Sequence, residues 1–361
     1  MFDNNYYTPE IHGDYCVHSI GDLALEEGET IRDCKLAYKT FGRLNESRSN
    51  AILVTTWYAG TSEIMEDVYI GEGHALDPTK YFIIVINQIG NGLSSSPHNT
   101  PAPHNGPRFP KVRIADDVRA QHKLLTEVFN IQSLELVVGA SMGALQTYEW
   151  AVRFPSMVKR AAPIAGVAKT THHEQLFSEA LIGAMTSDPA WDDGWYSQPH
   201  AVHRGLRRHA RLWGTMGFST EALKQEKWTD LGFNSFDDFL VGFLENYFLP
   251  MDPNDLISMA WKWRNADVGR IAGGDLRVAL RKIKACVFVM PIDEDLFYPP
   301  RDCLYEANVI PNAFFRPIRN VWGHLGIFGL EPGFIEQIDK NLNELLAIQL
   351  APKKKLCGLI K

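Results

Sequence analysis

Residues 136–146 read LVVGASMGALQ and decide the fold of this chain. The apolar run at the start predicts a buried strand, and the pattern from residue 142 onward predicts a helix. Gly139, Ser141 and Gly143 form a GxSxG pattern at the turn between them. In this context the serine stands in a strained turn, and the helix N-terminus favours negative charge near it. We therefore expect Ser141 to be a nucleophile; the alternative is a turn in which Ser141 only caps the helix.

Five short, largely apolar segments predict the strands of a sheet, at residues 51–55, 81–86, 134–138, 160–164 and 286–290. Residues 114–129, IADDVRAQHKLLTEVF, have apolar positions at helical spacing, and residues 142–154 have a second helical pattern. Strands that alternate with helices and are apolar throughout predict an α/β fold. Its sheet should be mostly parallel and covered by helices on both faces.

A different pattern runs through residues 169–280, which are rich in helical spacing and in aromatic residues and poor in strand-like runs. This stretch begins after one expected strand and ends before the next. We expect residues 1–168 and 281–361 to form the α/β core and residues 169–280 to form an inserted helical lid. Such a lid would cover the crevice where open α/β sheets bind ligands.

A nucleophilic serine needs a histidine base and a carboxylate that orients the histidine. In chains with the GxSxG turn these groups follow in the order serine, acid, histidine. The acidic run DED at residues 293–295 follows the strand expected at residues 286–290, and His324 comes later in NVWGHLGIFG. Of the twelve histidines, His324 is the one that fits this order. The sequence thus predicts a triad of Ser141, His324 and an acid from residues 293–295.

Acyl transfer by a serine also needs two main-chain N–H groups that stabilise the oxyanion of the tetrahedral intermediate. One comes from the residue after the nucleophile and the other from the loop after an earlier strand. Met142 is the expected source of the first. Tyr58, in TWYAG after the strand expected at residues 51–55, is the expected source of the second.

Composition and charge exclude several other functions. The chain has 36 Lys and Arg against 43 Asp and Glu, a net charge of −7, so it lacks the basic field that nucleic-acid binding requires. No stretch reaches the ~18 apolar residues of a membrane span. The five cysteines are scattered and never spaced as CxxC, which argues against disulfides and structural zinc. With no visible secretory signal, we expect a cytoplasmic protein.

Cofactor and metal motifs are also missing from the sequence. GNGLSSS, residues 90–96, follows a strand but is neither GxGxxG nor a phosphate-binding loop. His172 and His173 are adjacent rather than four apart, so they do not form a metal-binding pair. We expect neither a bound cofactor nor a metal ion.

The chain resembles the homoserine O-acetyltransferases of the α/β-hydrolase superfamily over about residues 36–342. The segments that carry this resemblance are LAYKTFGRLNESRSNAILV, FPKVRIADDVRAQHKLL, VVGASMGALQTYEWAVRFP, MDPNDLISMAWKWRNAD and IDEDLFYPP. The resemblance implies an α/β-hydrolase fold with a helical lid. It also implies that Ser141 accepts the acyl group, that His324 is the base and that Asp295 is its partner. Asp293 is the alternative acid.

Three positions bear on the substrate. The family has an aspartate directly after the catalytic histidine, thought to meet the homoserine ammonium group, where this chain has Leu325. Phe218 stands where the family has a tyrosine of the lid pocket. Arg211 matches the arginine that meets the homoserine carboxylate, although most arginines in such a basic helix face solvent. An α-amino acid would leave its ammonium group desolvated and unpaired, which costs several kcal/mol. Homoserine is therefore a poor candidate for the acceptor.

The sequence thus predicts a serine-dependent enzyme that hydrolyses a small acyl ester, such as an acetyl ester, through an acyl-Ser141 intermediate. One alternative is transfer from acetyl-CoA to a hydroxyl compound, since both reactions use the same catalytic residues. A second alternative is a protein that keeps this fold and binds a ligand but is catalytically silent. We expect a small-molecule substrate, no nucleic-acid or membrane partner, and a possible homodimer through the aromatic-rich lid.

Overall fold

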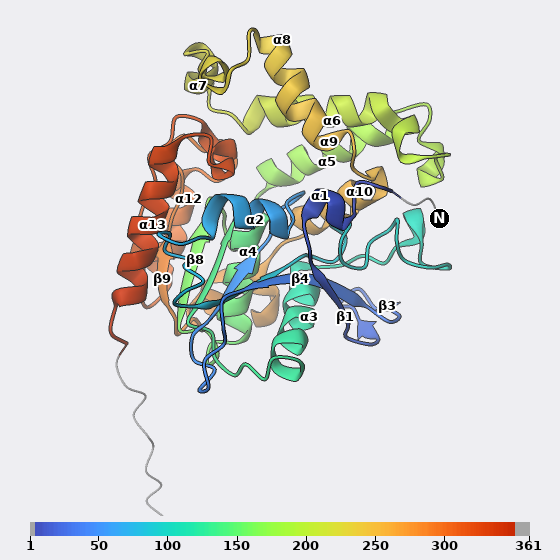
Figure 1. Ribbon diagram of the computed structural model, residues 1–361. Helices are drawn as coiled ribbons and strands as arrows, with labels where there is room; N and C mark the ends of the chain where they lie inside the picture. Colours follow the sequence, from blue (N-terminus) through green and yellow to red (C-terminus); the bar gives the residue numbers. More distant parts are fainter. Residues whose placement is uncertain (1–3, 351–361) are drawn as a thin grey trace, which may run out of the picture.

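The computed structural model describes residues 4–350 and is built around an eight-stranded sheet (Figure 1). The strand order is β1-β4-β6-β5-β7-β8-β9-β10. β1 and β4 pair antiparallel at one edge, β4 is antiparallel to β6, and the other pairs are parallel. The bounds are β1 Cys16–Ser19, β4 Lys35–Phe41, β5 Ala51–Thr55, β6 Phe82–Ile86, β7 Leu136–Ala140, β8 Arg160–Ile164, β9 Cys286–Val289 and β10 Ala313–Phe315; β2 Leu23–Ala24 and β3 Thr30–Ile31 form a separate pair.

Helices connect the strands and continue to the end of the described chain. The α-helices of the core are α1 Pro9–His12, α2 Ser62–Tyr69, α3 Ile114–Glu127, α4 Met142–Arg153, α12 Pro300–Val309 and α13 Pro332–Ala347. Those between β8 and β9 are α5 His172–Thr186, α6 His203–Met216, α7 Thr220–Lys224, α8 Phe236–Phe239, α9 Asn246–Phe248, α10 Pro253–Arg264 and α11 Leu276–Leu280. Shorter 3₁₀ turns are η1 Gly106–Arg108, η2 Asp192–Gly194, η3 Pro199–Val202, η4 Lys227–Leu231, η6 Val268–Ala272 and η7 Gly323–Phe328, and η5 Leu240–Glu245 is a π-helix.

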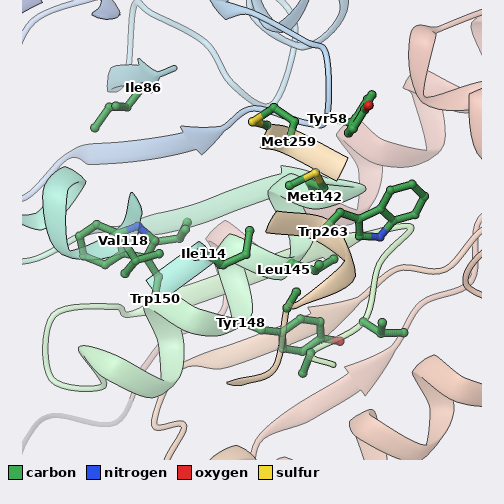
Figure 2. Packing of buried hydrophobic residues seen from close by; sticks show 14 of the residues in the cluster. Tyr58, Ile86, Ile114, Val118, Met142, Leu145, Tyr148, Trp150, Met259 and Trp263 are labelled. Atoms are coloured by element: carbon green, nitrogen blue, oxygen red, sulfur yellow. The ribbon is translucent and has the colours of Figure 1, made fainter. Parts of the chain in front are cut away.

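The sheet is buried on both faces because its side chains alternate between two cores. Leu53 of β5 lies in the core that contains α3 and α4, whereas its neighbours Ile52 and Val54 lie in the core that contains α2 and α13. This alternation is the period of two of an extended strand. Figure 2 shows the first core, in which Val118 and Trp150 bring α3 and α4 together. The continuous apolar strands of the sequence therefore do face two layers of helices.

The strands predicted from apolar runs are present in the sheet. β5 and β8 have the predicted bounds, and β6 starts one residue later than expected. β7 is displaced along the chain to Leu136–Ala140, because Leu134 forms only a single bridge with Val158. The sequence did not predict β1, β4 or β10. These strands lie at or next to the sheet edges, where partly exposed positions interrupt the apolar pattern.

Residues 169–280 form a group of helices above the carboxyl ends of the strands, coloured green to orange in Figure 1. Their packing brings aromatic side chains together, and Trp213 and Trp263 stack with ring centroids 5.7 Å apart. We call this stretch the helical insertion. Its role as a lid stays a prediction, as do the domain limits. Residues 1–3 and 351–361 of the expected core lie outside the described chain.

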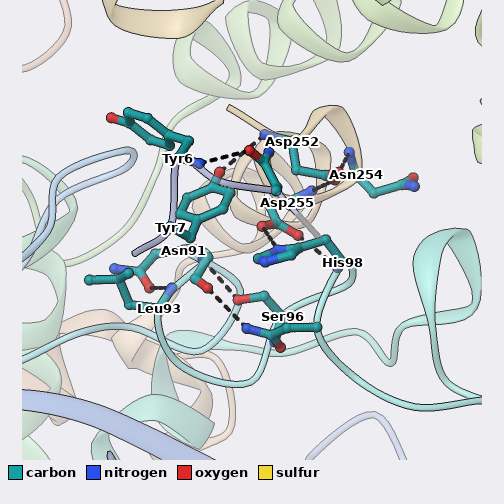
Figure 3. A network of polar contacts seen from close by, with 12 residues as sticks. Tyr6, Tyr7, Asn91, Leu93, Ser96, His98, Asp252, Asn254 and Asp255 are labelled. Carbon is teal, nitrogen blue, oxygen red and sulfur yellow. Dashed lines mark hydrogen bonds and ion pairs between the residues drawn. The ribbon is translucent and has the colours of Figure 1, made fainter. Parts of the chain in front are cut away.

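The N-terminal segment ties the helical insertion to the core (Figure 3). The hydroxyl of Tyr7 accepts a hydrogen bond from the Asp252 N–H (3.1 Å), and the Tyr7 ring stacks on His98 at 4.6 Å. His98 in turn contacts Asp255 of α10, with Nδ1 and Oδ2 2.5 Å apart. These contacts fix the start of α10 against a core loop. Among the helices of residues 4–350, none is long and apolar enough to cross a membrane.

Candidate active site

Ser141 occupies the sharp turn between β7 and α4. Its φ of 54° and ψ of −122° belong to a region that L-residues rarely adopt, so the turn stores strain. The flanking glycines are required by close contacts with β5. A Cβ atom at Gly139 would lie 2.0 Å from Thr55 Oγ1, and one at Gly143 would lie 2.5 Å from Thr55 O. The GxSxG pattern is thus the condition for packing this turn against β5.

A line of hydrogen bonds joins Ser141, His324 and Asp295. Ser141 Oγ lies 2.8 Å from His324 Nε2, and His324 Nδ1 lies 2.7 Å from Asp295 Oδ2. All three residues are buried, with exposed fractions of 4%, 1% and 3%. Because an ionised Asp295 only accepts hydrogen bonds, Nδ1 carries the proton and Nε2 is left to accept the proton of the serine. The structure therefore brings the three residues together in the geometry that a serine nucleophile needs.

The acid in contact with His324 is Asp295, and Asp293 lies elsewhere. Asp295 Oδ1 accepts the N–H groups of Phe297 (2.8 Å) and Tyr298 (3.0 Å), so its second oxygen is directed at the imidazole. Asp293 Oδ1 accepts the N–H of Asn320 at 3.0 Å. Asp293 thus stabilises the loop before the histidine. Geometry places Asp295 in the site, in agreement with the motif comparison.

The cavity at Ser141 is narrow and largely apolar. Its walls come from the loop after β5, from the helical insertion and from the histidine loop: Trp57, Tyr58, Ala59, Ser141, Trp213, Phe243, Leu244, Tyr247, Phe248, His324, Leu325, Ile327 and Phe328. We call it the Ser141 cavity. An apolar cavity with a few convergent polar groups suits a small, weakly polar ligand. Sequence reasoning missed most of the aromatic wall, since only the aromatic enrichment of residues 169–280 pointed to it.

The two expected oxyanion donors flank Ser141. Met142 begins α4, and Tyr58 lines the Ser141 cavity. Within residues 4–350, neither the Tyr58 N–H nor the Met142 N–H donates a hydrogen bond to another group of the chain. The Tyr58 hydroxyl is engaged elsewhere, since it donates to Leu256 O at 2.8 Å. Both N–H groups therefore have no hydrogen-bond acceptor within the described chain, as expected of donors reserved for an oxyanion.

Of the three expected substrate contacts, Leu325 lines the Ser141 cavity and the other two do not. Arg211 is half exposed, and its Nε donates to Glu245 Oε1 at 2.8 Å. Phe218 is buried against Phe239, with ring centroids 5.1 Å apart. Arg211 is thus held in an ion pair with Glu245, and Phe218 packs in the hydrophobic core. Neither side chain lines the Ser141 cavity.

In the part of the chain that the structure describes, no three His, Cys, Asp or Glu side chains cluster so as to hold a metal ion. Ser141 and His324 line the Ser141 cavity and lie in the hydrogen-bonded order that acyl transfer by a serine requires. These groups define the class: an enzyme of α/β architecture with a serine nucleophile.

Comparison with known proteins identifies the family. Residues 54–239 match the model of the α/β-hydrolase fold. The ethyl acetate hydrolase of Pseudomonas veronii is 56% identical over 95% of this chain and 99% of its own length. The solved structure of the acetyl esterase MekB is 56% identical, with a TM-score of 0.95, over 96% of this chain and all of that chain. A homoserine O-acetyltransferase of Leptospira biflexa is 32% identical over 85% of this chain and 88% of its own.

The chain therefore belongs to the α/β-hydrolase family of enzymes. This result confirms the fold class and the enzyme class predicted from the sequence, and it confirms the resemblance to the homoserine O-acetyltransferases as a more distant relationship. The identity is higher to the proteins named as an ethyl acetate hydrolase and an acetyl esterase, at 56%, than to the homoserine O-acetyltransferase, at 32%.

Proposed function

We propose that this protein hydrolyses small acetyl esters through an acyl-Ser141 intermediate. The observation that carries the proposal is the hydrogen-bonded line from Ser141 through His324 to Asp295, whose first two residues line an apolar cavity. Its likeness to an ethyl acetate hydrolase and to an acetyl esterase supports the same substrate class.

The reaction follows from the geometry in two halves. In the first, His324 Nε2 takes the proton of Ser141 Oγ while Oγ attacks the ester carbonyl carbon. The resulting oxyanion is stabilised by the Tyr58 and Met142 N–H groups, and the ester C–O bond then breaks as His324 returns the proton to the departing alcohol. In the second half, His324 deprotonates a water molecule that attacks the acyl group, and the carboxylic acid leaves as Ser141 regains its proton.

The walls of the Ser141 cavity favour a small, uncharged ester. Most of the lining side chains are aromatic or aliphatic, and Leu325 gives this wall no carboxylate that could pair with an ammonium group. Transfer of an acetyl group to another hydroxyl compound is the second candidate, because a relative named homoserine O-acetyltransferase shares the fold over most of its length. Hydrolysis needs no cofactor, whereas transfer would use acetyl-CoA as a second substrate.

A direct assay separates the two candidates. The purified protein is given ethyl acetate alone and, separately, acetyl-CoA with and without alcohols, and free acetate is measured. Acetate release from ethyl acetate without any added acceptor supports hydrolysis. Strict dependence on acetyl-CoA and an acceptor would establish transfer, and absence of turnover with every substrate would leave the binding alternative.

Two further expectations accompany this proposal. A homodimer through the helical insertion predicts a mass of twice 40.7 kDa in light scattering. A cytoplasmic location is expected from the five scattered cysteines of the sequence, and cell fractionation would check it.

A further inference from the structure

A line of buried side-chain amides runs from the core to the loop that carries Tyr58. Trp150 Nε1–H donates to Gln121 Oε1 (2.7 Å), and Gln121 Nε2–H donates to Gln146 Oε1 (2.6 Å). Gln146 Nε2–H then donates to the main-chain oxygen of Thr56 (2.9 Å). All four residues are fully buried. Because an indole only donates and a carbonyl only accepts, the two ends of the line fix the orientation of both amides.

A second amide, that of Gln88 after β6, also donates to this loop. Gln88 Nε2 donates to Thr56 O at 2.8 Å and to Trp57 O at 3.2 Å. The Trp57 C=O and the Tyr58 N–H belong to one planar peptide unit and point in opposite directions. Holding the oxygen of Trp57 therefore sets the direction of the Tyr58 N–H, which is one of the two expected oxyanion donors.

Gln146 acts one peptide unit earlier, because the Thr56 oxygen that it holds precedes the Trp57–Tyr58 peptide, and it connects this loop to the other expected donor. It stands on α4, one turn after Met142, whose N–H is the second expected donor. The end of β5, where the loop begins, is tied to the same turn, since Thr55 Oγ1 donates to Gly143 O at 2.8 Å. Two side chains thus join α4 to the end of β5 and to the loop that leads to Tyr58.

We propose that Gln146 and Gln88 are positioning residues that hold the Tyr58 N–H in line with the Met142 N–H. This inference rests on the proposed function, in which both N–H groups stabilise an oxyanion. Hydrogen bonds that run in one direction through a buried line strengthen one another, so the Trp150–Gln121 end supports the loop from a distance. The binding energy of such donors is realised only when their positions are correct, and a displacement of about 1 Å can cost about 10²-fold in rate.

Gln146→Met tests the proposal, because methionine keeps the volume and removes the donor. We expect kcat/KM for ethyl acetate to fall about 10-fold to 10²-fold through kcat, with KM nearly unchanged. A methyl trifluoromethyl ketone gives an independent measure, since Ser141 Oγ adds to its carbonyl carbon, His324 takes the hydroxyl proton and the oxyanion meets the same two donors. Its inhibition constant should rise by a similar factor.

Thr170→Val is the matched control. It removes a buried hydrogen bond from Thr170 Oγ1 to Ala266 O (3.0 Å) and a partly buried one to Arg264 O (3.1 Å), in the helical insertion. This variant is expected to change the melting temperature and to leave kcat and the inhibition constant unaltered. Equal losses of kcat in both variants would show a general structural effect and overturn the proposal.

Two further variants extend the test. Gln88→Met removes the donor to Trp57 O, and Trp150→Phe removes the donor at the far end of the line. Gln88→Met should resemble Gln146→Met, and Trp150→Phe should give a smaller loss in the same two quantities. If Gln146→Met does not fold, these two variants decide the question. Lower melting temperatures with wild-type kcat and inhibition constant would overturn the positioning role. If the wild-type protein binds the trifluoromethyl ketone tightly but hydrolyses no acetyl ester, the proposed function is refuted. The inhibition constants of the variants would still test the positioning role in that case.

Discussion

His324 Nε2 lies 2.8 Å from Ser141 Oγ although 183 positions separate the two residues in the chain. The serine reaches this point because β7 ends in a strained turn, and the histidine reaches it because the loop after β10 bends back through Gly323, whose φ is 73°. A Cβ at Gly323 would lie 2.9 Å from the main-chain oxygen of Glu294. Two residues with positive φ, the strained Ser141 and Gly323, thus bring the imidazole next to the serine hydroxyl.

Replacing Ser141 by glycine or by alanine separates strain from chemistry. Both variants lose the hydroxyl and should lose activity by a factor of about 10³ or more. Glycine adopts a φ of 54° without steric cost, whereas alanine keeps the strain. We expect Ser141→Gly to be more stable than Ser141→Ala by about 1 kcal/mol in urea unfolding. Equal stabilities would contradict the strain argument, and near wild-type activity in either variant would refute the nucleophile.

Asp295 and Asp293, the two candidate acids of the sequence analysis, should respond differently to replacement by asparagine. Asp295→Asn places a donor where His324 Nδ1 needs an acceptor, and kcat should fall by a factor of about 10⁴. Asp293→Asn keeps an oxygen that can accept the Asn320 N–H, so its effect on kcat should stay below about 10-fold. Steady-state kinetics on ethyl acetate measures both. A larger loss for Asp293→Asn would mean that the triad acid is misassigned.

The central parts of the fold and site could be predicted because local patterns determine them. The run LVVGASMGALQ combines a strand, a turn that needs glycines and a helix, so it specifies the position of Ser141 without tertiary information. The order of serine, acid and histidine then reduced the candidates to His324 and an acid from residues 293–295, and the family resemblance favoured Asp295 with Asp293 as the alternative. Long-range contacts distinguish the two aspartates, since Asp295 lies 2.7 Å from His324 Nδ1 whereas Asp293 accepts the N–H of Asn320.

Other parts depend on long-range contacts and left no local signal. Arg211 stands in a basic helix, and its partner Glu245 is 34 residues further along the chain. The local sequence around Arg211 or Glu245 does not predict this ion pair. The aromatic wall of the Ser141 cavity is equally non-local, because Trp57, Phe243 and Phe328 come from three separate segments.

Leu325→Asp should change the preference of the acyl-enzyme for its acceptor. The side chain of Leu325 is nearly buried in the cavity wall, so a carboxylate there would disfavour an apolar ester and could pair with an ammonium group. We expect kcat/KM for ethyl acetate to fall about 10-fold or more, and the ratio of acetylated homoserine to free acetate to rise. Leu325→Asn, which has a similar shape and no charge, is the control. The same product ratio in both variants would argue against a role for charge.

Glu306 should make the stability of the protein depend on pH. It is buried on α12, where its Oε1 accepts the Ala168 N–H at 2.7 Å, and burial raises its pKa from 4.5 to about 8. Between these two pH values the folded protein holds a proton that the unfolded chain releases, so the free energy of unfolding falls as pH rises. The contribution of the protonated acid is complete below about pH 4.5 and lost above about pH 8.

Glu306→Gln removes this titration and keeps an oxygen for the Ala168 N–H. Relative to the wild type, the variant should gain up to about 1.4 kcal/mol of unfolding free energy for each pH unit in this window, so its advantage should be larger at pH 8 than at pH 5. Urea unfolding at several pH values measures the difference. Glu336→Gln, at an exposed position of α13, is the control for loss of one charge and should show no such trend. A difference between Glu306→Gln and the wild type that stays constant from pH 5 to pH 8 would mean that Glu306 is ionised in the folded protein.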